Sequence, residues 1–389
     1  MELINNNQVP EGYKKTEVGV IPEDWDVLPL GEITSFIGSG KSIVKSRLGD
    51  YPLYGSTGII TYSQKFEYQG DAILVARVGA NAGKLNCVSG QYGVSDNTII
   101  IKLKDNSNIH FFLYQLRHKN LNSLVFGSGQ PLITGTQIKN LNVINPKASE
   151  QKAIAQTLSD VDALIDALDK LITKKRNIKT DTMQQLLTGK TRLLGFRGEW
   201  EIKKIEDIAR PVSVKNVENE KLPVLTCSKH LGFVDSLAYF KNQIFSKNTT
   251  GYKVICFGEI GYPSNHIEEG SIGIQNLYDK ALVSPIYTIF SVNQEIDSHF
   301  LHKVLKLDYY RQKFKTLTTS SVDRRGSLRW PEFSQITVSL PPLPEQKAIT
   351  QVLSDIDTEI TALEKRRAKT QTIKQGMMQE LLTGRTRLI

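Results

Sequence analysis

Positive charge is most concentrated between residues 311 and 329. Six basic residues occur there against a single acidic one, Asp323: Arg311, Lys313, Lys315, Arg324, Arg325 and Arg329. Hydroxyl side chains, Ser321 among them, are interleaved with these charges. Guanidinium groups pair with phosphates or read guanine edges, and hydroxyls donate hydrogen bonds to phosphates. The segment therefore suits contact with DNA, although a solvated basic loop without a partner has the same composition.

A second candidate is the glycine-bearing loop FGSGQPLIT at residues 126–134. Gly127 and the glycine that follows Ser128 permit close approach of the backbone to DNA. The side-chain amide of Gln130 can pair with adenine. A tight surface turn explains the same residues. Weaker candidates for DNA contact are Arg77, Lys84 and Lys41 in the first half of the chain, and Asn265 and His266 in the second.

Catalytic and metal chemistry find less support in the sequence. GSGKS (38–42) is similar to a phosphate-binding loop, but Ser35 stands where such a loop has its first glycine. His299 and His302 lie one helical turn apart without a third metal ligand. We find no [ND]PP[YFW] tetrad of an adenine methyltransferase and no glycine-rich methyl-donor loop. The sequence therefore predicts a chain without catalytic residues, bound metal or cofactor of its own.

Composition places the chain among soluble proteins that bind an acidic partner. Its 389 residues suggest two or three domains, and its net charge is +9. No run of 18 or more apolar residues occurs, and residues 1–10 lack the apolar core of a signal peptide. The three cysteines are scattered, which is typical of a reducing compartment. We expect a cytoplasmic protein with no membrane contact.

An internal repeat divides the chain. Residues 150–194 and 345–389 align without a gap at an offset of 195, with 26 of 45 positions identical. Weaker similarity links EDWDVLPLGEI (23–33) with GEWEIKKIEDI, around Trp25 and Trp200. Because repeats indicate duplicated structural units, we predict four segments: a variable domain at 1–145, a helix at 146–194, a second variable domain at 195–340 and a second helix at 341–389.

Both repeated segments have the heptad spacing of long helices. Apolar residues form a seam in each, at Ile154, Leu158, Val161, Ile165 and Leu168 in the first copy and at Ile349, Leu353, Ile356, Ile360 and Leu363 in the second. Arg367 takes the next seam position in the second copy. Gly189 and Gly384 mark the helix ends. We expect the two seams to pack on each other in an antiparallel pair, with the C-terminal tail meeting the first domain near Trp25.

The variable domains are expected to be mixed in structure. Segments 71–79, 97–103, 251–261 and 284–292 are rich in β-branched residues and predict strands, while 110–125 and 298–314 have helical spacing. The predicted fold is α+β: two mixed α/β domains joined by two long antiparallel coiled-coil helices, with pseudo-twofold internal symmetry.

These features together resemble a known family. The EQKAI-to-LLTG helix after a proline-bearing strand end, the domain openings around Trp25 and Trp200, and the FGSGQPLIT loop are similar to the specificity subunits of type I restriction-modification systems. The resemblance covers essentially the whole chain and includes the doubled arrangement. The second domain departs from the pattern, with SVDRRGSLR (321–329) at the position of the FGSGQPLIT loop.

The resemblance implies a function in targeting. It implies that each variable domain is a target-recognition domain reading one half of a bipartite double-stranded DNA site. It implies that the helix pair sets the spacing and holds two methyltransferase subunits, with restriction subunits joining through the complex. The methyl donor S-adenosylmethionine, ATP and Mg²⁺ would then belong to those partners. The alternatives left open are a coiled-coil protein-binding adaptor without DNA specificity and a self-sufficient methylase.

Overall fold

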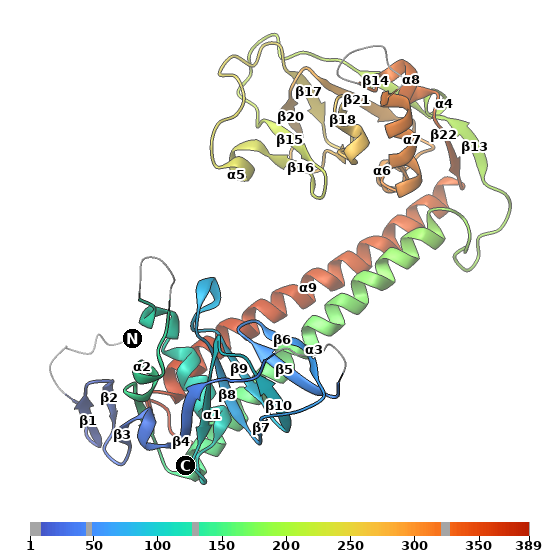
Figure 1. The fold of residues 1–389 in the computed structure, drawn as a ribbon. Helices are drawn as coiled ribbons and strands as arrows, with labels where there is room; N and C mark the ends of the chain where they lie inside the picture. Colours follow the sequence, from blue (N-terminus) through green and yellow to red (C-terminus); the bar gives the residue numbers. More distant parts are fainter. Residues whose placement is uncertain (1–8, 44–48, 127–131, 320–326, 389) are drawn as a thin grey trace. The chain divides into compact units, whose positions relative to one another are not determined.

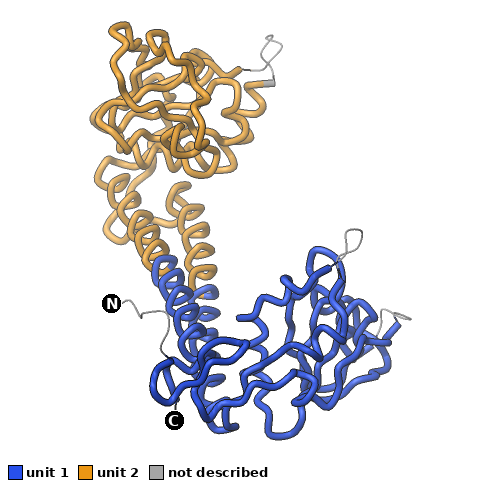
Figure 2. The backbone as a smooth tube through the Cα atoms, turned by 90° about the vertical axis from the view of Figure 1, so that its left-hand side faces the viewer, with its two compact units in different colours: residues 1–170, 364–389 blue, residues 171–363 orange. Residues whose placement is uncertain are grey.

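The computed structural model describes residues 9–43, 49–126, 132–319 and 327–388, and it forms two compact units (Figure 2). Unit 1 comprises residues 1–170 and 364–389, and unit 2 comprises residues 171–363. The boundaries fall inside two long helices, α3 (Ala148–Leu186) and α9 (Leu343–Leu381). Each unit therefore consists of one variable domain and half of each helix. No helix among the described residues is both long and apolar enough to cross a membrane.

Two four-stranded sheets build the domain of unit 1 (Figure 1). The first is antiparallel, in the order β4 (Thr34–Ser39), β11 (Thr98–Leu103), β8 (Ala72–Ala76) and β9 (Leu85–Val88). The second has the order β6 (Gly58–Ser63), β5 (Tyr51–Gly55), β10 (Gln91–Val94) and β7 (Tyr68–Gln69), and its β5–β10 pair is parallel.

Smaller elements of unit 1 connect its sheets to the long helices. They are the hairpin of β1 (Tyr13–Thr16) and β2 (Gly19–Pro22), the pair of β3 (Asp26–Pro29) and β12 (Asn142–Asn145), the helices α1 (Ile109–His118) and α2 (Gly135–Lys139), and the 3₁₀ turns η1 (Leu30–Glu32), η2 (Gly79–Asn81) and η3 (Leu121–Leu124). The side chain of Asn108 caps α1 by accepting a hydrogen bond from the amide of Phe111. The buried face of α1 joins the same apolar core as Ile154 and Leu158 of α3.

Unit 2 repeats the central sheet of unit 1. Its order is β14 (Ala209–Val212), β21 (Tyr287–Val292), β18 (Ile260–Pro263) and β19 (Gly273–Ile274), again antiparallel. The remaining elements are the pairs β13 (Glu201–Lys204) with β22 (Thr337–Leu340), β15 (Leu225–Ser228) with β16 (Gly232–Asp235) and β17 (Lys253–Cys256) with β20 (Lys280–Val283), the helices α4 (Ile205–Ile208), α5 (Ser236–Phe240), α6 (Ser298–Leu305), α7 (Asp308–Thr319) and α8 (Trp330–Ser334), and the 3₁₀ turn η4 (Ile267–Glu269).

Three elements expected from the sequence are broken in the structure. The helix expected over 110–125 ends at His118, because Asn120 adopts a left-handed backbone with φ of +49°. The strand expected over 251–261 is two strands, β17 and β18, separated by a turn in which Gly258 has φ of +84°. The helix expected over 298–314 is divided into α6 and α7. Local periodicity continues through each break, so the sequence pattern does not reveal the turns.

The two long helices run antiparallel within each unit, with a register that repeats. In unit 1, Lys374 of α9 contacts Asp162 of α3 at 2.5 Å. In unit 2, Lys179 contacts Asp357 at the same distance. The second pair is the first one shifted by 195 residues with the helices exchanged, which is the pattern that a twofold repeat of the pair requires.

The expectation that the two apolar seams pack on each other is wrong for the first two residues of each seam, which lie in separate apolar cores. The first seam, from Ile154 to Leu168, lies in unit 1, whereas the second, from Ile349 to Leu363, lies in unit 2. Ile154 and Leu158 join the core of the unit 1 domain together with Leu381 and Leu382 of the C-terminal segment. Ile349 and Leu353 join the unit 2 core with Leu186 and Leu187. Each helix therefore buries its first half against the domain from which it emerges.

The remaining seam residues differ in how deeply they are buried. Ile165, Leu168 and Ile360 are buried, while Val161, Ile356 and Leu363 are half-buried. Arg367, which interrupts the second seam, forms an ion pair with Asp169 at 2.7 Å within unit 1. Polar residues thus take over the helix contact beyond the apolar seams.

Candidate nucleic-acid interface

The end of the central sheet gathers the predicted contact residues of unit 1. Arg77 follows β8 directly and Lys41 lies two residues after β4, while the amide of Ala76 donates to the carbonyl of Lys84 at 2.9 Å. Backbone hydrogen bonds from Gly40 to Thr98 and from Arg77 to Asn97 hold these strand ends together. Lys41 and Lys84 are exposed. Three dispersed positions of the sequence therefore share one edge of the sheet.

The FGSGQPLIT loop is anchored at the same edge. The amide of Ile133 donates to the carbonyl of Arg77 at 2.9 Å, and Leu132 forms bridges with both Phe126 and Val78. The guanidinium of Arg77 donates to the Ser39 hydroxyl at 3.3 Å, and its buried Nε has no hydrogen-bond partner among the described residues. Gly127, Ser128 and Gln130 lie outside the described residues.

Unit 2 anchors its corresponding loop in the same way. The amide of Leu328, which is 195 residues after Ile133, donates to the carbonyl of Ser264 at 2.9 Å. Ser264 directly follows β18, as Arg77 follows β8. Ile133 and Leu328 are both fully buried. Leu328 after the basic loop and Ile133 after the glycine-bearing loop are therefore anchored at equivalent sheet edges, although the sequences of the two loops differ.

The basic residues around the unit 2 loop have different surroundings. Arg311 is paired with Asp308, and the ammonium of Lys313 lies 6.0 Å from the ring centroid of Tyr309. Lys315 and Arg329 are exposed, with Arg329 at the N-cap position of α8. Ser321, Arg324 and Arg325 lie outside the described residues. The expected DNA contacts of this segment therefore remain predictions, and Asp308 already compensates the charge of Arg311.

GSGKS has a structural role that the phosphate-binding pattern does not describe. A Cβ on Gly40 would lie 2.2 Å from the carbonyl oxygen of Val94, so only glycine fits there. The hydroxyl of Ser42 accepts from the amide of Val94 and donates to Glu67 at 2.5 Å. These contacts fasten the segment after β4 to β10, and a hydroxyl paired with a carboxylate is unsuited to a phosphate.

Among the residues that the structure describes, neither His299 nor His302 belongs to a group of three potential metal ligands. His302 bonds to the carbonyl of Ile272 at 3.2 Å, and burial lowers its pKa to about 4. Within the described part of the chain, one group of three potential ligands lies close together, namely His266, Glu268 and Glu269. The side chains of His266 and Glu269 are more than half exposed, at 56% and 57%. This group is an open surface cluster rather than an enclosed metal centre.

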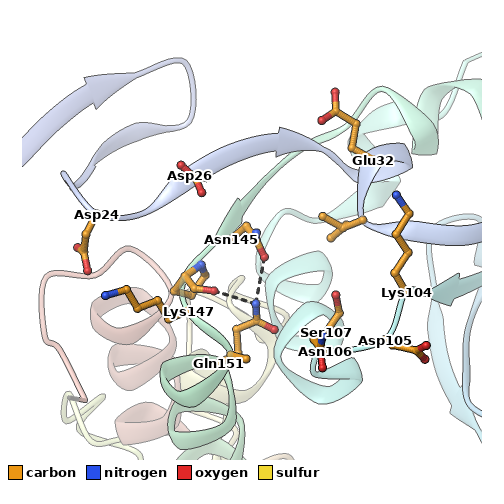
Figure 3. A pocket seen from close by; sticks show the side chains of 13 residues that line it. Asp24, Asp26, Glu32, Lys104, Asp105, Asn106, Ser107, Asn145, Lys147 and Gln151 are labelled. Atoms are coloured by element: carbon orange, nitrogen blue, oxygen red, sulfur yellow. Dashed lines mark hydrogen bonds between the residues drawn. The ribbon is translucent and has the colours of Figure 1, made fainter.

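A cleft of about 460 Å³ lies where α3 begins in unit 1 (Figure 3). Its lining includes four carboxylates and two lysines: Asp24, Asp26, Glu32, Asp105, Lys104 and Lys147. Gln151 braces it by donating to the side chain of Asn145 at 3.0 Å and to the carbonyl of Pro146 at 2.9 Å. An excess of carboxylates repels phosphate, so this cleft is a poor surface for DNA.

The helix termini are fixed by a buried ion pair that sequence reasoning did not identify. Arg387 forms hydrogen bonds with Glu150 at 2.7 and 2.9 Å and with Asp24 at 2.9 Å, and its guanidinium lies 5.4 Å from the ring centroid of Trp25. Arg387 lowers the pKa of Asp24. In unit 2, Arg192 pairs with Glu345 and lies 5.7 Å from the ring centroid of Trp200. The sequence feature that could have revealed these ion pairs is the Thr-Arg-Leu tripeptide, which occurs near the end of both repeat copies.

Comparison with known proteins identifies the fold and the family. The family model described as "Type I restriction modification DNA specificity domain" matches residues 22–178 and again 197–375. The chain belongs to this family. It carries two copies of the family's domain, and each copy includes one variable domain and most of the helix that follows it.

The similarity to relatives and to solved structures covers most of the length of both proteins. The type I restriction enzyme MjaVIII specificity subunit of Methanocaldococcus jannaschii is 26% identical over 428 aligned positions, covering 100% of this chain and 99% of the relative. The EcoDI specificity subunit of Escherichia coli is 22% identical and covers 89% and 84%. The S subunit structure from M. genitalium superposes with a TM-score of 0.60 at 18% identity, covering 98% of both chains. The HsdS structure from Thermoanaerobacter tengcongensis gives 0.52 at 16% identity, covering 94% and 98%. At this identity the structures support the fold.

Proposed function

We propose that this chain is a non-catalytic DNA-recognition subunit of a type I restriction-modification enzyme, and that each variable domain reads one half of a bipartite site. The observation that carries the proposal is the duplicated loop anchor. Ile133 and Leu328 hold loops of unlike sequence at equivalent sheet edges within two copies of a DNA specificity domain. A constant frame with variable loops is the arrangement expected when two modules read different sequences.

The long helices act as the spacer and as the surface for two methyltransferase subunits. The repeated contacts Asp162–Lys374 and Lys179–Asp357 support two equivalent faces on the helix pair. S-adenosylmethionine, ATP and Mg²⁺ are supplied by partner subunits, and restriction subunits join through that complex. The family assignment favours this function over an adaptor without DNA specificity.

The decisive experiment is to map methylated positions in cells that express this chain with a type I methyltransferase subunit. We expect one bipartite motif with a fixed gap, and no methylation when either protein is expressed alone. The double variant R324A/R325A should relax or weaken one half of the motif, while R77A affects the other half. A base contact affects one position by about 1–3 kcal/mol, whereas a phosphate contact weakens all sequences alike.

Two further measurements separate this function from the alternatives. Binding of the complex to its DNA should weaken steeply as salt rises, because phosphate contacts release counterions. At saturation, two methyltransferase subunits should co-purify with each chain. Methylation by the chain alone, or binding of a single methyltransferase subunit at saturation, contradicts the proposal.

A further inference from the structure

A second cleft of about 570 Å³ lies in unit 2, beside the anchor of the basic loop. Its wall on one side is the end of β18 with Pro263 and Asn265, next to Ser264, the residue that holds Leu328. The opposite wall is the β15–β16 turn with Lys229 and the end of α5. The cleft therefore lies at the sheet edge where Leu328, the residue that follows the basic loop, is anchored.

The two walls are held in place by hydrogen bonds. The ammonium of Lys306 donates to the carbonyls of Lys229 and Gly270, both at 2.8 Å, and so ties the β15–β16 turn to the segment after η4. The carboxylate of Asp235 caps α5 by accepting from the amides of Leu237 and Ala238. A site fixed by the protein's own hydrogen bonds loses little entropy when it binds a ligand.

The cleft presents free polar groups beside exposed aromatic rings. Among the described residues, the side-chain amide of Asn265 makes no hydrogen bond, and the same holds for the ammonium of exposed Lys229. Tyr239 and Phe240 of α5 are 48% and 41% exposed, and their rings meet edge to face with centroids 4.9 Å apart. These rings offer an apolar surface beside the polar groups of the cleft.

These groups match the major-groove edge of one base pair. A side-chain amide with both a donor and an acceptor pairs with N6 and N7 of adenine, and an apolar ring contacts the methyl group of thymine. A lysine with a free ammonium neutralises a neighbouring phosphate. We propose that Asn265 reads the adenine of an A·T pair in the half-site recognised by unit 2, with α5 against the thymine and Lys229 on the backbone. The inference rests on the proposed function, and it assigns the DNA specificity at one position of the half-site to Asn265.

The test uses the full chain with its methyltransferase subunit and the methylated motif as readout. N265A should make one position of one half-site degenerate, with discrimination at that position falling roughly fivefold to a hundredfold. K229A should leave the motif unchanged but reduce the salt dependence of binding by about one counterion. The matched control is Q294A, an exposed amide beyond the other end of β21, which should change neither quantity.

Outcomes distinguish this inference from the proposed function. If the wild-type complex gives no bipartite motif, both are overturned. If the wild-type motif appears and N265A and N265Q both retain it in full, the cleft does not read a base. Uniform loss of affinity in N265A for every sequence also overturns base reading, since it indicates a phosphate contact. N265Q guards against misfolding of N265A, because its longer amide keeps the donor and the acceptor and should weaken the preference for adenine rather than remove all binding.

Discussion

Arg387 shows how a single side chain fastens the end of the chain to its beginning. Its guanidinium binds two carboxylates from distant parts of the sequence, and one of them, Glu150, is 5% exposed. The indole of Trp25 donates to the same Glu150 carboxylate at 2.9 Å. Because a buried carboxylate without a cation is costly, the arginine is required wherever this glutamate is buried.

We therefore predict that R387A destabilises unit 1 by about 2 kcal/mol, less than a fully buried pair because the arginine side chain is 23% exposed. R385A is the matched control, because Arg385 is 58% exposed and lies 3.6 Å from an exposed glutamate. It should change stability by less than about 0.5 kcal/mol. Urea unfolding of the full chain measures both, and equal effects of the two variants contradict the role assigned to Arg387.

His302 makes the stability of unit 2 depend on pH. Burial lowers its pKa to about 4 from an unfolded value near 6.5, so the unfolded chain takes up a proton before the folded chain does. The stabilising contribution is complete above about pH 6.5 and is lost as pH falls toward 4, on the order of 3 kcal/mol. The free energy of unfolding of wild type and H302Q, measured across this range, should differ in slope. Parallel curves would show that His302 titrates normally.

At the scale of elements, the periodicity of the sequence predicted the long helices but not the surfaces against which they pack. The heptad spacing predicted both long helices, and the glycines Gly189 and Gly384 lie at φ of +69° and +71° just past their ends. What the seams pack against was not predictable, because it depends on the register between segments about 200 residues apart. The same holds for the cleft beside Asn265, whose walls come together only through β15, α5 and β18. Single candidates such as Arg77 were named, but their shared sheet edge required the strand order.

The repeated ion pairs also determine how the helices can be shortened. Removing residues 167–173 and 362–368 takes one heptad from each helix and leaves both Asp162–Lys374 and Lys179–Asp357 in register. Each helix loses about 10 Å at 1.5 Å per residue. We predict that the double deletion shortens the preferred gap between half-sites without changing either half, as read from the methylated motif.

Deleting residues 167–173 alone is the control for this experiment, because it displaces one set of ion pairs by two turns. The single deletion should therefore abolish methylation or the co-purified complex. An unchanged gap in the double deletion would show that the helices do not measure the distance between half-sites.

At the scale of the whole molecule, the C-terminal part of each repeat copy completes the core of the unit to which the other copy contributes its first half. Unit 1 takes Lys374, Met378, Leu381, Leu382 and Arg387 from α9 and its tail. At an offset of 195 the first copy has the same residue types, namely Lys179, Met183, Leu186, Leu187 and Arg192. The first copy can therefore supply every one of these contacts, whereas Arg367 has no counterpart because Ile172 stands at its position.

This identity predicts that the fragment 1–194 forms a homodimer in which each copy closes the other's domain. Antiparallel pairing of one helix with its own copy obeys a true twofold axis, so the assembly closes at two chains. The dimer should bind a palindrome made of the first half-site and its inverted copy, at a similar gap, in preference to the natural asymmetric site. Association now depends on concentration, because the covalent link between the halves is gone. Sedimentation and binding to both DNAs measure this, with R192A in the fragment expected to weaken the dimer because Arg192 replaces Arg387. A stable monomer, or a preference for the asymmetric site, would mean that the two halves are not interchangeable.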